Sequence, residues 1–232
     1  MSPPKKLNAT KKEIIQIATR LFLERGFTDT SVKLISDEMG ISTGNLTFHY
    51  PTKEHLLAVL VKMLCDFQWH TMKVTLEEGS SPLMVLCLEL ASMTSICEEN
   101  DVSRDFYLSA YTHPMTLDII RVSDQKKAEK LFAPYCSNWR GMTFAEAETL
   151  VSGIEYATLM NTPSSPSLPV RLAGALKAIL KIYDVPDNEM DECIEKVLKM
   201  DYQSIGRQVL KNFTDYVHNV SDQQLKGYLL NQ

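Results

Sequence analysis

The chain has 232 residues, of which 44% are hydrophobic and 23% charged, and its formal net charge is −5. This composition is typical of a globular protein, and no apolar run is long enough to span a bilayer, so we exclude a membrane-spanning protein. No apolar segment follows the lysines of MSPPKK, which excludes a secretory signal and predicts a cytoplasmic protein. Five cysteines without a C-x-x-C pair predict buried, reduced thiols rather than disulfides or a zinc site.

The charges are distributed unevenly along the chain. Residues 1–65 hold nine Lys or Arg and six Asp or Glu, a balance of +3, so the remaining residues carry −8. A basic front on an acidic body is typical of a protein whose front binds nucleic-acid phosphates. A solvated face with a few extra lysines would have the same charge, so this observation alone does not decide between them.

Nearly every segment has the hydrophobic periodicity of a helix, and the interruptions fall at Pro, Gly and Ser residues. We therefore predict an all-α protein. Four helices are expected in the first third of the chain, over about 10–25, 31–39, 42–50 and 52–76. Further helices are expected over about 82–98, 101–112, 115–138, 143–161, 168–184, 187–200 and 201–218, followed by a short tail helix.

The second and third helices have the spacing of a helix-turn-helix. Two short helices that cross tightly need a small residue at the contact and a turn residue that tolerates positive φ, and Ser36 and Gly40 meet these needs. Four apolar residues are spaced to fill the core beneath them: Val32, Ile35, Ile41 and Leu46. Spacing alone does not distinguish a DNA-binding motif from an ordinary tight helical corner, so both interpretations stay open at this point.

Polar residues are expected on the outer face of this motif. Asn45 suits bidentate contact with adenine, and Thr43 suits contact with a base edge or a thymine methyl group. Gly44 costs about 1 kcal/mol relative to alanine in a helix, which a close approach of the backbone to DNA would explain. His49 suits a phosphate contact or an ordinary surface position. Four residues offer hydroxyl or ammonium groups that position a protein on phosphates: Ser31, Thr47, Tyr50 and Lys53.

The segment TSVKLISDEMGISTGNLTFHYPTKEHLL, from Thr30 to Leu57, resembles the signature of the TetR family of transcriptional regulators. The resemblance covers about the first quarter of the chain. It implies a homodimeric repressor whose third helix enters the major groove of double-stranded operator DNA, and whose C-terminal domain binds a small-molecule effector that changes the spacing of the two heads. It implies DNA contacts for Ser31, Lys33, Ser42, Thr43, Gly44, Asn45, Thr47, His49 and Lys53.

The chain also departs from the family pattern. The family usually has Ala, Tyr and Phe at the positions of Ser36, Thr47 and Tyr50. The contact surface of the third helix is therefore smaller and more polar than usual, and the operator sequence does not follow by analogy.

We expect a helix-turn-helix DNA-binding domain over residues 1–51 and a larger helical ligand-binding and dimerisation domain over 52–232, with the fourth helix as connector. Two late helices carry small residues four apart, which permits close backbone approach. These are Gly153 and Ala157 on one helix and Gly174 and Ala178 on the other. The resemblance implies a four-helix dimer interface over residues 143–184, and packing within one chain is the alternative.

Candidates for the effector pocket are aromatic and methionine residues on apolar helix faces, although such residues are more often ordinary core. They are Trp69, Met72, Met93, Phe106, Tyr107, Tyr111, Tyr156 and Met160. Two polar candidates accompany them, His113 and Glu155. Glu155 lies in the apolar run LVSGIEYATLM, where an unpaired carboxylate is costly, so it must reach solvent, a partner or a ligand cation.

The sequence contains no grouping typical of an enzyme. It has no G-x-S-x-G, H-E-x-x-H or phosphate-binding glycine loop, so we expect no catalytic activity. The S-x-x-K match at 123–126 lies in a charged run, which we interpret as a solvated helix face. The five histidines show no ligand spacing, so we expect no metal or cofactor. The alternatives are a helical module that binds a partner protein and an architectural DNA-binding protein without effector control.

Overall fold

The computed structural model of the protein describes residues 10–77 and 81–229, without the side chains of 72, 73 and 75–77. Over these residues the chain forms twelve α-helices and no strand, so the all-α prediction is confirmed. The helices are α1 (Lys11–Arg25), α2 (Val32–Met39), α3 (Thr43–His49), α4 (Lys53–Glu77), α5 (Pro82–Glu99), α6 (Asp101–Thr112), α7 (Pro114–Leu131), α8 (Gly141–Leu159), α9 (Leu168–Ile182), α10 (Asp187–Leu198), α11 (Tyr202–Asn219) and α12 (Asp222–Tyr228). Within the described residues, none of these helices is long and apolar enough to cross a membrane.

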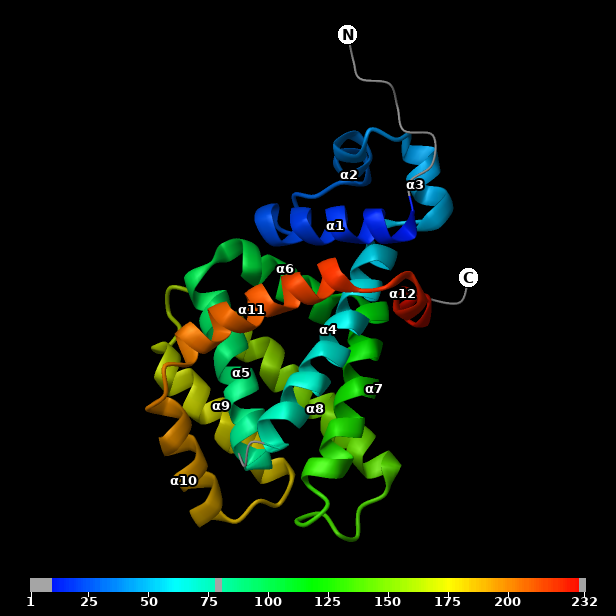
Figure 1. Ribbon diagram of the computed structural model, residues 1–232. Coiled ribbons are helices and arrows are strands. Elements are labelled where there is room, and N and C mark those ends of the chain that lie inside the picture. The colour runs from blue at the N-terminus through cyan, green and yellow to red at the C-terminus, as the bar shows by residue number, and fades with distance from the viewer. Residues whose placement is uncertain (1–9, 78–80, 230–232) are drawn as a thin grey trace.

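Helices α1, α2 and α3 form a compact unit, called the head, at one end of the molecule (Figure 1). Capping serines and a glycine determine where its helices begin and end. Ser31 and Ser42 begin α2 and α3 as N-caps, and Gly40 ends α2 in the left-handed conformation with φ +66°. Ser36 is 2% exposed, and its hydroxyl donates to the carbonyl of Val32 at 2.8 Å. Its small side chain is therefore buried, while its position at the crossing of α2 and α3 stays a prediction.

Helix α4 leads from the head into the body, which comprises α5–α12 (Figure 1). Inside the body α7 packs on α4 and α8, and α9 packs on α8 and α10. The buried residues form one cluster that continues from α1 to α12, so the head and the body share a core. The domain boundary predicted after residue 51 falls between α3 and α4 and stays a prediction.

The last helices, whose role the sequence left open, connect the body to the head. Helix α11 lies across α5 and reaches α1, and α12 contacts α4 (Figure 1). The amide of Gln16 in α1 donates to the carbonyl of His218 at 2.8 Å. Lys62 of α4 donates to the carbonyl of Gly227 at 2.8 Å. The position of the head therefore depends on α11 and α12 as well as on α4.

The contact of α11 with α5 requires a glycine. A Cβ added to Gly206 would lie 2.7 Å from the carbonyl oxygen of Ser92. We expect Gly206→Ala to lower the free energy of unfolding by about 1–3 kcal/mol, because backbone must move to admit the methyl group. Urea denaturation at fixed protein concentration measures this change.

Gly227→Ala in α12 is the matched control, since a Cβ there meets nothing within 4 Å. We expect it to be neutral or stabilising by up to about 1 kcal/mol, from helix propensity. Equal stability of Gly206→Ala and the original protein would show that α11 does not pack on α5 this closely.

The sequence-based boundary of one helix was wrong. The pattern predicted a helix over 115–138, whereas α7 ends at Leu131 and turns occupy the residues up to Arg140. Pro134 explains the difference, because proline lacks a backbone N–H and disfavours the helical conformation of the residue before it. The turn that follows is anchored by Cys136, whose thiol donates to the carbonyl of Tyr183 at 3.3 Å.

Candidate functional site

The outer face of the head carries most of the residues predicted to contact DNA. Ser31, Lys33 and Ser42 are exposed, as are Thr43 and Gly44. Asn45, Thr47 and His49 are partly exposed on α3. A Cβ at Gly44 would meet nothing within 4 Å, so no contact within the chain requires glycine there. The head therefore presents a compact, mostly polar surface centred on α3.

Two hydroxyl groups on this surface also serve as helix caps. The hydroxyl oxygens of Ser31 and Ser42 accept hydrogen bonds from the backbone N–H groups of Leu34 and Asn45, each at 3.1 Å. A hydroxyl that accepts in this way keeps its proton for donation to another acceptor. Both serines can therefore cap their helices and donate to a phosphate at the same time.

Asn45 has an unused acceptor. Its Oδ1 is buried and has no hydrogen-bond partner among the described residues. A buried acceptor without a partner costs about 1–3 kcal/mol, so contact with a donor from outside the chain would stabilise a rotated carboxamide. An external donor such as the amino group of adenine can reach this oxygen only after the carboxamide rotates outward.

Phe48 is the surface residue that sequence reasoning missed. It is 79% exposed on α3, and its ring packs edge-on against the His49 ring with centroids 5.3 Å apart. An exposed phenylalanine on such a surface suits apolar contact with a thymine methyl group. Helical spacing could have revealed it, because Leu46 faces the core and the residue two positions later must face outward.

Two residues predicted to face phosphates instead hold the head together. Tyr50 is 3% exposed, and its hydroxyl donates to the carbonyl of Lys11 at 3.3 Å. Burial raises the pKa of Tyr50 above its ordinary range. The ammonium of Lys53 donates to the carbonyl of Phe27 at 2.9 Å and lies 4.2 Å from the centre of the Phe27 ring. The prediction for Tyr50 is corrected, because its ring fills the core, and Lys53 is already bound within the head.

The charge of the described part of the head is balanced. Residues 10–60 contain six Lys or Arg and six Asp or Glu. Lys33 pairs with Asp37 on α2, and Lys62 is bound to the carbonyl of Gly227. Lys5 and Lys6, which contribute to the basic excess of the first 65 residues, lie outside the described residues. Recognition by this face therefore depends mainly on hydroxyl, amide and aromatic groups.

The late helices present an open face of small residues. Gly153 and Ala157 of α8 and Gly174 and Ala178 of α9 are exposed. A Cβ at either glycine meets nothing within 4 Å, so packing within one chain does not fill this face. Two large apolar side chains lie at helical spacing from the small ones: Leu150 is 61% exposed and Val170 is 60% exposed.

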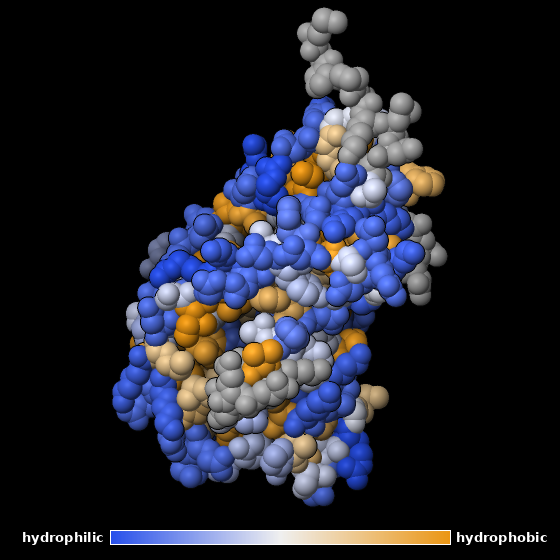
Figure 2. Space-filling view, in the orientation of Figure 1, coloured by the Kyte–Doolittle hydropathy of each residue, from blue (hydrophilic) through white to orange (hydrophobic). Residues whose placement is uncertain are grey.

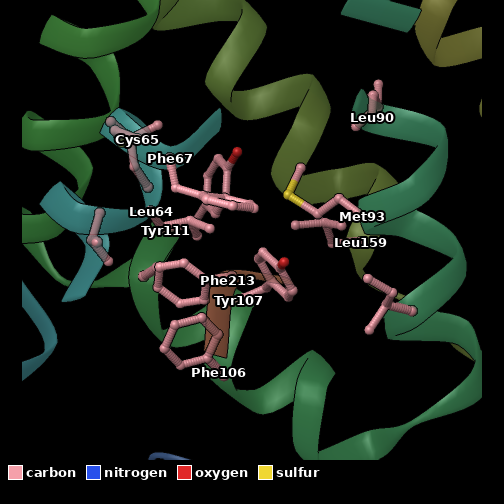
Figure 3. Packing of buried hydrophobic residues seen from close by; sticks show 14 of the residues in the cluster. Leu64, Cys65, Phe67, Leu90, Met93, Phe106, Tyr107, Tyr111, Leu159 and Phe213 are labelled. Atoms are coloured by element: carbon pink, nitrogen blue, oxygen red, sulfur yellow. The ribbon is translucent and has the colours of Figure 1, made fainter. Parts of the chain in front are cut away.

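A cavity lies inside the body, between α4, α5, α6, α7, α8 and α9. Met93, Tyr107 and Tyr111, three of the predicted pocket residues, line it and lie in the interior shown in Figure 3. Trp69, Phe106, Tyr156 and Met160 do not line it, and the side chain of Met72 lies outside the described residues. The ring of Trp69 packs instead beneath the ammonium of Lys130, 4.6 Å away.

The cavity also contains charged residues that the sequence did not single out. Lys127 is 4% exposed and Glu148 is 3% exposed. Lys127 and Asp124 belong to the charged run around residues 123–126, so the interpretation of that run as a fully solvated face was wrong. The signal was present in the spacing, because Asp124, Lys127 and Leu131 share one face of α7. Glu155 lines the same cavity, and its Oε2 accepts from the hydroxyl of Tyr111 at 3.0 Å.

Known proteins resemble this chain mainly in the head. Residues 14–60 match the family model described as bacterial regulatory proteins, tetR family. The transcriptional repressor KstR2 of Mycolicibacterium smegmatis is 30% identical over 94 residues, 40% of this chain and 46% of that protein. The transcriptional regulator HbdR of Aromatoleum sp. is 26% identical over 117 residues, 50% of each chain. The chain thus spans half or less of the length of these relatives.

Longer matches are more distant. An uncharacterised regulator of Lactococcus lactis is 22% identical over 203 residues, 86% of this chain and 96% of that protein. Among solved structures, a gamma-butyrolactone receptor described as ArpA-like aligns at 17% identity with a TM-score of 0.44, covering 86% of this chain and 95% of that one. The TetR family protein CprB of S. coelicolor aligns at 20% identity with a TM-score of 0.44, covering 81% and 96%.

The head and body together define an all-helical protein with an N-terminal helix-turn-helix. The match over residues 14–60 assigns the head further: it is similar to the N-terminal domain of the tetR family of bacterial regulatory proteins, and the curated relatives share this similarity.

Proposed function

We propose that the protein is a DNA-binding transcriptional regulator, and that the outer face of α3 reads an operator in the major groove. Three residues on the outer face of α3 carry this proposal: Thr43 and Phe48, which are exposed, and Asn45, which is partly exposed. Thr43 and Asn45 suit base edges, and Phe48 suits a thymine methyl group. Ser31 and Ser42 suit phosphates and would fix the register on the duplex.

The regulator acts as a homodimer on a palindromic site. The open face of α8 and α9 supports this assembly, because small residues allow close helix approach and exposed Leu150 and Val170 gain from burial. Two-fold symmetry of the protein then places two heads on half-sites about one helical turn apart.

A small molecule bound in the cavity releases the repressor from its operator. Helix α6 supports this step, because Tyr107 and Tyr111 line the cavity and Asp105, on the same helix, contacts the loop after α1. A ligand changes operator affinity only if it binds one head geometry better than the other.

Selection of bound duplexes from a random pool by the purified protein, at several salt concentrations, tests the DNA-binding proposal. We expect an enriched palindrome and an affinity that falls with salt. Asn45→Ala and Phe48→Ala should each relax preference at one base pair per half-site by about 1–3 kcal/mol, which is about fivefold to 150-fold.

Met142→Ala is the matched control for Phe48→Ala, because Met142 is 75% exposed on α8, outside the head. We expect it to leave the selected sequence unchanged. A protein that binds no duplex even at low salt would instead favour the alternative function, a module that binds a partner protein.

A further inference from the structure

The cavity contains more acidic than basic side chains. Among the described residues that line it, four carry carboxyl groups and one carries an ammonium group. The acids are Glu89, Asp124, Glu148 and Glu155, and the base is Lys127. Removing several carboxylates from water costs several kcal/mol for each unless a cation or hydrogen bonds compensate. Whether these carboxylates leave room for a further cation therefore depends on the hydrogen bonds and ion pairs that each of them already makes.

Lys127 is already shared between two of the acids. Its ammonium lies 3.0 Å from Oε1 of Glu89 and 2.8 Å from Oδ1 of Asp124, and its side chain is 5% exposed. This ion pair connects α5 to α7. The ammonium of Lys127 is therefore paired with Glu89 and Asp124, and not with Glu148 or Glu155.

Among the residues that the structure describes, Glu148 and Glu155 accept hydrogen bonds only from tyrosines. They lie seven residues apart on one face of α8, where Glu148 accepts from the hydroxyl of Tyr183 and Glu155 accepts from that of Tyr111. Arg121 of α7 lies close to this face, but its Nε donates to Ser152 at 2.9 Å. A phenol donates one proton without supplying positive charge, so no hydrogen bond from a cationic side chain compensates the ionised form of either glutamate among the described residues.

The other end of the cavity borders a second hollow. The two share Gln68, Glu89, Met93 and Tyr107, and the second hollow adds apolar residues from α5 and α11, including Val85, Ile205 and Val209. Figure 2 shows hydrophobic side chains gathered in the middle of the body, below α11. The space therefore has Glu148 and Glu155 with their tyrosines at α8, and mostly apolar side chains toward α11, where Glu89 is paired with Lys127.

We propose that this cavity binds an organic monocation with an apolar body. Its positive group lies between Glu148 and Glu155, against the ring of Tyr111, where carboxylates and an aromatic face both attract a cation. Its apolar body extends toward Met93 and Tyr107. The regulatory consequence of this binding, release from DNA, rests on the proposed function.

Without a ligand, Glu148 and Glu155 hold protons, and a bound cation displaces them. Burial, with repulsion from Asp124, raises the pKa of Glu148 to about 7 and that of Glu155 well above its ordinary range. The charged and titratable groups that face the two glutamates are Asp124 and Lys127 of α7, Tyr111 of α6 and Tyr183 after α9, while Glu89 of α5 and Cys65 of α4 face Lys127. A cation favours the ionised carboxylate, so its affinity rises as pH increases through about 7 and levels off above it.

Phenyltrimethylammonium and tert-butylbenzene test the proposal, because they have the same shape and differ in charge. Trp139 reports binding by fluorescence, since its ring centre lies 5.9 Å from that of Tyr183. At pH 8 we expect the cation to bind at least about tenfold more tightly than the neutral probe. Its affinity should rise about tenfold from pH 6 to pH 8, while that of the neutral probe stays constant.

Glu148→Gln removes one charge and keeps the shape of the side chain. We expect it to weaken the cation about tenfold or more at pH 8 and to flatten the pH profile, with tert-butylbenzene binding unchanged. Glu146→Gln is the matched control, an exposed glutamate on the same helix, and should alter neither probe. If Glu148→Gln fails to fold, Glu155→Gln carries the same test.

Three outcomes would overturn the proposal and leave the acids as a structural network. They are equal binding of the two probes, no binding of either probe, and an unchanged pH profile in both glutamine variants. These titrations contain no DNA. A palindrome recovered without cation binding therefore overturns the ligand class alone. Cation binding by a protein that binds no duplex overturns the regulatory function alone.

Discussion

Gly174→Glu is expected to convert the protein from a dimer to a monomer and to reduce operator affinity by at least about 100-fold, because linked half-site binding contributes about 10²–10⁴ in affinity. The two-fold axis would bring the new carboxylates of both copies into the α8–α9 face, where they lose hydration and repel each other. Sedimentation velocity measures the association state, and titration of the selected duplex measures the affinity.

The same substitution should not harm the isolated chain. A side chain at position 174 meets nothing within 4 Å, and replacing a helical glycine stabilises a helix by up to about 1 kcal/mol. Gly227→Glu adds the same charge at another open helical glycine and should leave the dimer intact. A Gly174→Glu protein that remains dimeric at micromolar concentration would show that the interface lies elsewhere.

Local sequence signals predicted the head well. Gly40 has the positive φ that the turn requires, and Ser36, predicted to be a small residue facing a neighbouring helix, is buried. Both properties depend on neighbours within a few residues, so periodicity and turn chemistry are sufficient. Tyr50 was misplaced because its hydroxyl partner is the carbonyl of Lys11, 39 residues away in sequence. Spacing along one short helix does not contain that contact.

The cavity was predicted only in part, for the same physical reason. Tyr107 and Tyr111 were among the aromatic candidates because they occupy an apolar helix face. Glu148 and Lys127 were missed because a buried charge is recognised by its partners, which come from other helices. Glu155 alone interrupts an apolar run, so its need for a partner was visible in the sequence, although the identity of that partner, Tyr111, was not.

Asp105→Ala is expected to separate ligand binding from operator release. The Asp105 carboxylate accepts from the backbone N–H of Thr28 at 2.8 Å and from the Thr28 hydroxyl at 2.5 Å. A Cβ on Gly26, whose φ is +89°, would lie 2.7 Å from the same carboxylate, so the loop after α1 fits closely against α6. Tyr107 and Asp105 lie on the same helix, so we expect a ligand that shifts α6 through Tyr107 to shift the loop of the head through Asp105.

The measured quantity is the ratio of operator dissociation constants with and without phenyltrimethylammonium. Coupling between two sites commonly changes such a ratio by about 5-fold to 150-fold, and we expect Asp105→Ala to bring it within about twofold of one. Asp101→Ala is the control, because Asp101 is exposed on the same helix and pairs only with Arg104. Circular dichroism verifies that the head of each variant is folded. An undiminished ratio in Asp105→Ala would mean that α4, which also runs from the cavity to the head, transmits the change without α6.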